Sequence, residues 1–512
     1  MFNQFRILKD ILGYSVSALG SQALGLLAGL WIARTLGPSD FGIWNAVSLV
    51  LAYGAYVEFG VLSTMGRDLP YCLGQRDAEK AASLEGAARW ATISGAVLVA
   101  AVIIFVSYSP GALFFWPSAV AFLSSQPSMM LTGLRLMAIV LIFQQVYAYH
   151  RTVLRAHNLF GELGQQQFLL ALITAVLGVA GVVALGLRGR LIAAVIAQGG
   201  IVVYALYRNP WRRLAKPHLK TMWTLMRVGI PITISGSIVS LVTTIDRPMV
   251  LGFLGSEQLG YLGLAFLVTG TVSLVPAMAS QVLYPRITYH FGQSGGDIAA
   301  LRSFVLRPPL LLACLLPVVI GPVFLALPVL IRIFLPAFSP GIMAARIVVV
   351  GIFFYSILGL TDYFLVTTGK LKQYALFGCG ALALNVTGDY IALRLGYGIE
   401  GVAFTGTPLT YFVYSSVVIA YALSHYELAS GEWLRYFARL WSPFLYMVAL
   451  LWVVETLAHR WIVASTPLGL GAAVTAQIVF YLVGMVPLIM LAARELKLKL
   501  SWTSLTRVQA GH

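Results

Sequence analysis

Long apolar stretches separated by short polar ones follow one another along almost the whole chain, from Ile11 to Ala492. Each stretch is about 20 residues long, which is the length of a helix that crosses the hydrocarbon core of a bilayer. A chain this apolar satisfies its backbone hydrogen bonds in lipid by forming helices. The pattern predicts an all-α polytopic membrane protein with about fourteen spans, at 11–33, 42–64, 88–107, 128–149, 166–185, 190–207, 228–253, 261–281, 306–327, 342–366, 374–393, 401–424, 440–458 and 467–491.

The composition supports this fold class. Of the 512 residues, 59% are hydrophobic and only 10% are charged, whereas a soluble domain typically carries about 25% charged residues. No predicted loop is long enough to hold a soluble domain. The three cysteines, Cys72, Cys314 and Cys379, lie far apart and show no metal or redox spacing. We therefore expect them to be packing residues.

The basic residues indicate the orientation of the chain. The net charge is +16, and most of the lysines and arginines fall in alternate loops, above all in the loop 208–227. Because cytoplasmic loops collect Lys and Arg, this distribution predicts an even number of spans with both termini in the cytoplasm. This distribution accounts for the positive net charge, so no binding of nucleic acid has to be assumed. The first apolar run follows Arg6 and Lys9, has full spanning length and lacks a convincing cleavage site, so we interpret it as a span.

Two pairs of motifs indicate that six spans are repeated. Leu36–Trp44, after the first span, and Leu254–Leu262, after the seventh, share the order Leu-Gly, small, two polar-type positions, apolar, Gly, apolar. Gly186–Gly189 likewise matches Gly398–Gly401, at nearly the same offset. A repeat of six spans relates the halves by an axis along the membrane normal, as in some transporters.

This repeat predicts three parts. Residues 1–209 form an N-terminal six-helix bundle, residues 210–425 form a pseudo-symmetric second one, and residues 426–512 hold two extra helices and a basic cytoplasmic tail. The extra helices could hold an isoprenoid tail, pad the bundle or contact another chain.

Several motifs together resemble a known family. They are Leu36–Trp44, the stretch from Gly60 to Ala81 with Arg67-Asp68-Leu69-Pro70 inside it, Asp246-Arg247 in the seventh span, and Gly398–Ala403 before the twelfth. They resemble the polysaccharide transporters (oligosaccharide flippases, O-antigen translocase-like) of the multidrug/oligosaccharidyl-lipid/polysaccharide exporter superfamily. The resemblance covers essentially the whole chain in span number and spacing.

The resemblance implies two six-helix bundles around a central cavity that opens to one side at a time. It also implies a bacterial inner-membrane flippase that moves an undecaprenyl pyrophosphate-linked oligosaccharide for O-antigen, capsule or exopolysaccharide synthesis. A polysaccharide polymerase and chain-length proteins are possible partners, besides the substrate and membrane lipids.

Charged residues inside the spans are the main candidates for function, because such residues normally face a cavity or a partner. An arginine suits the oxygens of a pyrophosphate where water is scarce. We expect cavity charge from Arg135, Arg247, Asp246 and Glu58. For Asp246 and Arg247 the alternative of a fixed charge cluster that ties the two bundles together stays open. Structural pairing, or a position near the membrane interface, is favoured for Arg346 and Glu455.

Other charges suggest a cytoplasmic mouth and an ion-coupling site. The arginines predicted to attract the headgroup at the mouth, or simply to fix topology and contact anionic lipids, are Arg67, Arg151, Arg155 and Arg286. An intramembrane acid could exchange H⁺ or Na⁺, and Asp246, Asp362, Asp389 and Glu58 are all candidates. No other cofactor and no metal site is expected.

Two further functions remain as alternatives. A cation-coupled drug antiporter of the same superfamily would share the fold but typically has twelve spans. A membrane glycosyltransferase or polymerase would need catalytic acids and sizeable outer loops, and the longest outer loop, 108–127, contains no charged residue. Since no catalytic motif appears in a credible context, we expect a transporter rather than an enzyme.

Overall fold

In the computed structural model of the chain, the described residues are 4–109, 128–208, 219–273, 276, 283, 287–426, 428–461 and 467–497. Within them the regular structure consists of helices, and no strand is present. Contacts divide the chain into two compact units, Met1–Gly263 and Leu264–His512. The all-helical prediction is therefore confirmed for the described part of the chain.

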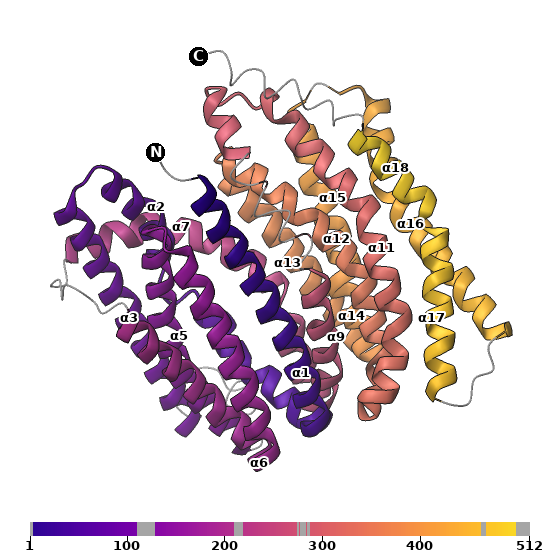
Figure 1. Cartoon of the computed structure of the whole chain (residues 1–512), viewed down its shortest axis with the longest axis horizontal. Helices are drawn as coiled ribbons and strands as arrows, with labels where there is room; N and C mark the ends of the chain where they lie inside the picture. Colours follow the sequence, from indigo (N-terminus) through magenta and orange to yellow (C-terminus); the bar gives the residue numbers. More distant parts are fainter. Residues whose placement is uncertain are drawn as a thin grey trace. The chain divides into compact units, whose positions relative to one another are not determined.

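Unit 1 is built from long apolar helices that lie side by side, coloured indigo to magenta in Figure 1. The most extensive packing joins α1 to α6, α3 to α5 and α5 to α6. The helices of this unit are α1 Gln4–Gly54, α2 Val61–Gly74, α3 Ala78–Tyr108, α5 Ser128–Ala156, α6 Phe160–Arg208, α7 Leu219–Val242, α8 Asp246–Leu254 and the first part of α9 Ser256–Val272.

Unit 2 contains the remaining long helices, from salmon to yellow in Figure 1. In this unit α12 packs against α11 and α15, while α16 and α17 pack against α11. After the short turn η2 Ala299–Leu301, its elements are α11 Arg302–Phe334, η3 Pro336–Gly341, α12 Ile342–Thr367, α13 Leu371–Arg394, α14 Gly398–Phe404, the π-helix η4 Thr405–Leu409, α15 Thr410–Leu423, α16 Ser430–Trp461, α17 Pro467–Gly484 and α18 Val486–Lys497.

The number of spans differs from the prediction. Eight helices of the described residues are long and apolar enough to cross a membrane, or up to ten if each of two bent pairs is one span. The count includes α6 once, although α6 contains the predicted fifth and sixth spans on either side of the non-helical residue Gly186. The count of fourteen is therefore not confirmed. The domain boundaries near residues 209 and 425 also stay predictions, and α7 and α8 pack with unit 1.

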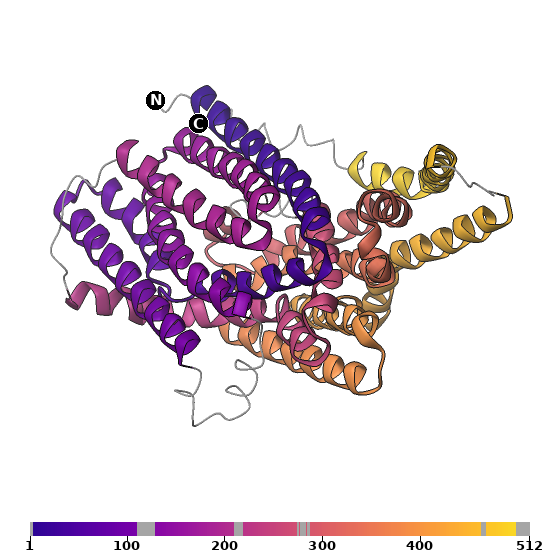
Figure 2. The same ribbon diagram turned by 90° about the horizontal axis from the view of Figure 1, so that it is seen from below.

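The two repeated motifs have the same backbone turn. In α1 the helix is interrupted at Gly37, with φ 73° and ψ 173°, and α1 changes direction there (Figure 2). Gly255, between α8 and α9, has φ 88° and ψ −178°. The second pair of motifs behaves similarly, because Gly186 and Gly398 have φ 59° and 58°. These conformations favour glycine, and they support the predicted equivalence of the motifs.

The two copies of the first motif also contact each other within unit 1. A side-chain carbon on Gly42 would overlap the carbonyl oxygen of Ser256, and one on Gly260 would overlap that of Pro38. Gly42 corresponds to Gly260, and Pro38 to Ser256, so the two contacts are equivalent by the repeat. Such reciprocity is the property of a two-fold interface.

Candidate functional site

Asp246 and Arg247 lie at a break in the predicted seventh span of unit 1. The helix α7 ends at Val242, and α8 begins at Asp246 after a non-helical turn. Asp246 is 3% exposed in the first turn of α8, where the helix dipole stabilises a carboxylate. The turn precedes Pro248, which occupies the first turn of α8, where proline is tolerated. Two apolar helix segments thus meet at a buried acid.

Arg247 lies beside groups from two helices. Its charge interacts with the Asp246 carboxylate and with the hydroxyl of Tyr53, and α8 contacts α1, which carries Tyr53. The side chain is partly buried. Arg247 and Asp246 therefore form one cluster with Tyr53. Both belong to the four residues predicted to supply charge to the cavity, and that role stays a prediction.

Glu58 occupies a second break in unit 1, between α1 and α2. Its Oε2 accepts a hydrogen bond from the backbone N–H of Leu62 at 2.6 Å, so the carboxylate caps the start of α2. On the other side of the break, the Gln145 amide donates to the carbonyl oxygen of Gly54. The sequence analysis singled out Glu58 as a cavity charge and did not assign it this role at a helix end.

Arg135 forms hydrogen bonds with the end of α3. Its Nε donates to Ser107 Oγ at 3.0 Å and its Nη2 donates to the Ser107 carbonyl oxygen at 2.9 Å. The guanidinium also lies 3.5 Å from the centroid of the Tyr108 ring. These contacts join α5 to α3. The structure does not bring Arg135 together with Arg247, and its place in the cavity stays a prediction.

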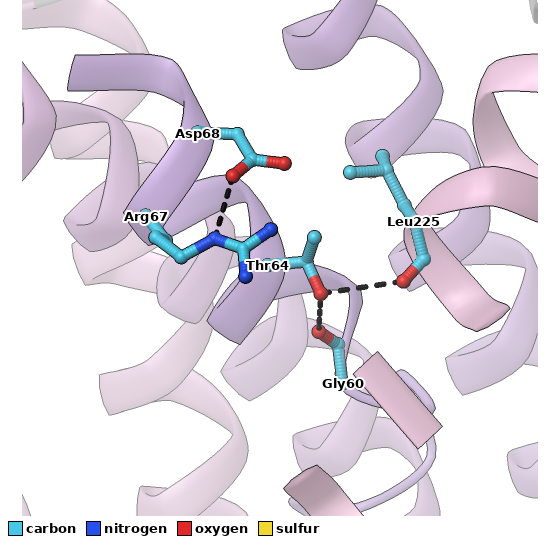
Figure 3. Close-up of polar contacts among 5 residues, drawn as sticks. All are labelled: Gly60, Thr64, Arg67, Asp68 and Leu225. Carbon is cyan, nitrogen blue, oxygen red and sulfur yellow. Dashed lines mark hydrogen bonds and ion pairs between the residues drawn. The ribbon is translucent and has the colours of Figure 1, made fainter. Parts of the chain in front are cut away.

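The predicted mouth arginines are placed on α2 and α5, which pack together. Arg67 Nε lies 2.7 Å from Asp68 Oδ1, with the arginine side chain 64% exposed (Figure 3). This hydrogen bond, with the charge of the carboxylate, raises the pKa of Arg67. Arg151 lies 5.3 Å from the Tyr147 ring centroid, and Arg155 is exposed in the last turn of α5. Arg286 lies outside the described residues.

In unit 2, Asp389 is fully buried on α13. The Thr405 hydroxyl donates a hydrogen bond to its Oδ1, and Asn385, one turn earlier on α13, is also fully buried. Thr405 begins the π-helix η4, and its carbonyl oxygen accepts from the Thr410 hydroxyl at 2.7 Å. Single-turn π-helices within α-helices often mark functional sites. Carboxylate, amide and hydroxyl groups gather here, all of which offer oxygen to a hard cation.

Asp362, on α12 of unit 2, has different neighbours. Its charge interacts with the hydroxyls of Tyr355 and Tyr414, and no ion pair joins it to any cation in the described part of the chain. An acid in such surroundings is suited to carrying a proton rather than to holding a metal ion. No group of three or more His, Cys, Asp or Glu among the described residues is placed to hold a metal.

Two other intramembrane arginines have structural contacts. Arg346 Nη2 lies 2.6 Å from Glu455 Oε1, so these two charges are partners within unit 2. Arg190, the first residue of the predicted span 190–207, is only 8% exposed and lies 4.0 Å from the Trp44 ring centroid. Nothing in the sequence around Arg190 indicates this burial, because its partner lies on another helix.

Comparison with protein families gives one match over more than half of the chain. The model of a family described as "Polysaccharide biosynthesis protein" matches residues 7–290. This region includes all but the first residues of α1, the helices α2 to α9, and therefore the Asp246-Arg247 cluster. No curated protein sequence matches the chain.

Solved structures show that the fold is shared with known transporters. A lipid II flippase, MurJ, in an inward closed conformation superposes with a TM-score of 0.66 at 14% identity, covering 94% of this chain and 99% of that one. An inward-facing multidrug resistance transporter of the MATE family, MOP superfamily, gives 0.60 at 15% identity, covering 80% and 96%. A MOP superfamily transporter from Pyrococcus furiosus gives 0.59 at 14%, covering 84% and 96%.

Proposed function

Because the chain belongs to the polysaccharide biosynthesis protein family, we propose that it is a flippase for an undecaprenyl pyrophosphate-linked oligosaccharide. The family match over residues 7–290 is the observation that carries this proposal. The fold, which a lipid II flippase shares, supports transport by alternating access. The proposed setting is a bacterial inner membrane with both termini in the cytoplasm, and the proposed partners are a polymerase and chain-length proteins.

In this proposal Arg247 stabilises the pyrophosphate as it crosses. A pyrophosphate in an apolar cavity needs a compensating positive charge, and a guanidinium can form paired hydrogen bonds with its oxygens. The break before α8 supports this role, because the two helix segments can tilt about it without disrupting their own hydrogen bonds. Asp246 then acts as the partner that Arg247 retains when no substrate is present.

Coupling to an ion is proposed at Asp389. The carboxylate of Asp389, the amide oxygen of Asn385 and the hydroxyl of Thr405 are oxygen ligands of the type that Na⁺ binds. Asp389 and Asn385 lie on α13, and Thr405 begins the π-helix η4 of the same unit. Asp362, among tyrosines, is the corresponding candidate for H⁺. Replacing Asp389 with Asn would then abolish the sodium dependence of transport, whereas the same change at Asp362 would alter its pH dependence.

The antiporter of cationic drugs is the second candidate function. Its specific support is the superposition with multidrug resistance transporters of the MATE family. At 15% identity this similarity shows the fold alone, so the substrate has to be tested directly.

The decisive experiment measures lipid-linked oligosaccharide in cells that lack this protein. We expect the oligosaccharide to accumulate on the cytoplasmic leaflet and to be cleared when the wild-type chain is restored. The variant Arg247→Ala should reduce export at least about ten-fold at normal abundance, since it removes charge-assisted hydrogen bonds of roughly 1.5–3 kcal/mol. Arg346→Ala is the matched control, because it removes an intramembrane arginine that is already paired with Glu455.

The same cells separate the alternatives. If Arg247→Ala clears the lipid-linked sugar as well as the wild type does, the proposed role of Arg247 is wrong. If the sugar never accumulates and sensitivity to cationic drugs rises instead, the chain is an antiporter. Arg135→Ala, measured in parallel, tests whether that arginine contributes to transport or only to the contact with Ser107.

A further inference from the structure

A pocket of about 520 Å³ lies within unit 1, between the first turns of α3 and α7 and one face of α2. The residues that α2 contributes are Thr64, Asp68, Tyr71 and Cys72, which recur at helical spacing on a single face. The pocket is on the side of the loops predicted to be cytoplasmic. None of the residues proposed above for transport lines it.

The base of the pocket is fixed by close packing of α2 on α7. The Thr64 hydroxyl lies 3.1 Å from the Gly60 carbonyl oxygen and 3.3 Å from that of Leu225, and can donate to either (Figure 3). Below it, Gly60 and Gly229 approach so closely that a side-chain carbon on either would overlap the other's backbone. The lining therefore belongs to rigid helices, which hold polar groups more accurately than loops do.

Two lysines line the pocket from positions where a cation is unfavourable. Lys80 is in the first turn of α3, and Lys220 is in the first turn of α7. The partial positive charge of a helix N-terminus repels a lysine there and attracts an anion. Both side chains are exposed, and neither forms a salt bridge within the described residues. The N-terminus of α3 is already capped, since the Asp77 carboxylate accepts from the backbone N–H of Lys80 at 2.9 Å. The start of α7 and the two ammonium groups therefore present positive charge to one cavity.

The one acid of the lining is already compensated. Asp68 is paired with Arg67 at 2.7 Å, and Arg67 itself does not line the pocket. Hydroxyl groups complete the wall, with Ser83 Oγ 3.4 Å from Thr221 Oγ1 across the gap between α3 and α7. Only one hydroxyl of that pair donates to the other, so one O–H remains available to a ligand. The lining therefore offers cations and neutral donors together.

We propose that this pocket binds a phosphate group through Lys80 and Lys220. Phosphate oxygens accept hydrogen bonds from ammonium groups and hydroxyls, which are the donors that the lining offers here. The phosphate can belong to an anionic phospholipid of the inner leaflet or to the isoprenoid pyrophosphate. In the second case the pocket receives the substrate headgroup before transport, and that reading rests on the proposed function.

Native mass spectrometry of the purified full chain tests this site. The detergent-solubilised protein is titrated separately with phosphatidylglycerol, undecaprenyl pyrophosphate and inorganic pyrophosphate. For at least one probe, the variant Lys80→Ala/Lys220→Ala should bind about ten-fold more weakly than wild type, because two charge-assisted contacts are lost. The probe whose affinity falls most identifies the source of the phosphate. A loss of affinity for any of the three probes supports the site.

Two control variants keep the result interpretable. Lys370→Ala/Lys372→Ala removes the same charge from unit 2 and should bind every probe like wild type. Lys80→Arg/Lys220→Arg keeps the charge and should retain most of the binding, which excludes misfolding as the cause of a loss. Unchanged binding of all three probes by the alanine variant, or an equal loss in the unit 2 control, overturns the proposal. Since binding is measured without transport, either outcome is independent of the export assay.

Discussion

The motif Leu36–Trp44 and its counterpart Leu254–Leu262 are two regions with different sequences and the same structure. Both contain a glycine with φ near 80° and ψ near 180°, Gly37 and Gly255, from which a new helical segment begins. Proline follows the first glycine and serine follows the second. Proline suits the start of a helix through its fixed φ, whereas the Ser256 hydroxyl lies 3.5 Å from that of Ser39. The backbone turn is therefore conserved between the copies by different local chemistry.

The two copies of the motif also contact each other, and the contact is reciprocal. Gly42 lies against Ser256, while Gly260 lies against Pro38, so each copy supplies both a flat glycine surface and a backbone carbonyl. Gly42 and Gly260 are needed because two backbones approach closely, whereas Gly37 and Gly255 are needed because their φ is positive. Substituting the two kinds of glycine should therefore destabilise the fold by different amounts. Because of the repeat, each effect should be seen at two positions.

The largest effect is expected at the close contact. Gly42→Ala and Gly260→Ala each place a methyl group where a carbonyl oxygen lies, so the backbones must separate. Such overpacking costs about 1–3 kcal/mol, and export should fall as well. Thermal unfolding of the purified variants and the export assay give the two readouts.

Gly25→Ala is the control for this prediction, because Gly25 is an exposed residue of α1 with open space around it. We expect no loss of stability there. A strong effect at Gly42 with none at Gly260 would contradict the reciprocal contact.

A smaller effect is expected at the two turns. Gly37→Ala and Gly255→Ala meet no neighbouring atom, but both force alanine into a left-handed φ region. With ψ near 180° this conformation is essentially restricted to glycine and costs another residue about 1–3 kcal/mol, but no helices have to separate. The two variants should lower the unfolding temperature by similar amounts. Gly236→Ala, in open space without a positive φ on α7, should not lower it. Unequal losses at Gly37 and Gly255 would show that the turns are not equivalent in energy.

Much of the fold can be predicted from the sequence, because apolar length and charge distribution act locally. The helical membrane class follows directly from the pattern, and the repeated Leu-Gly motifs locate the turns at Gly37 and Gly255. The break before Asp246 is harder to predict. Pro248 is the residue that would suggest a break there, but it lies inside α8, after the break. The number of spans is also hard to predict, because α6 continues as one helix on both sides of the non-helical residue Gly186.

The partners of charged side chains are the part that the sequence does not contain. Arg346 and Glu455 lie more than 100 residues apart and still form an ion pair. Arg135, which looks equally isolated in the sequence, is held by Ser107. The pocket around Lys80 and Lys220 cannot be predicted from the sequence either, because it forms only when α2, α3 and α7 pack together. Composition shows that a charge is in the membrane, and only tertiary structure shows what compensates it.

The smallest effect is expected where the two copies meet through side chains. Ser39 Oγ lies 3.5 Å from Ser256 Oγ in an exposed position, so water competes for both hydroxyls. We expect a coupling energy below about 0.5 kcal/mol in a double-mutant cycle of Ser39→Ala and Ser256→Ala, less than the roughly 1 kcal/mol of a typical protein hydrogen bond. Thermal unfolding of the two single variants and the double variant measures it. A coupling above about 1 kcal/mol would mean that the hydroxyls, rather than the glycine backbones, hold the copies together, and the ranking of the three effects would be reversed.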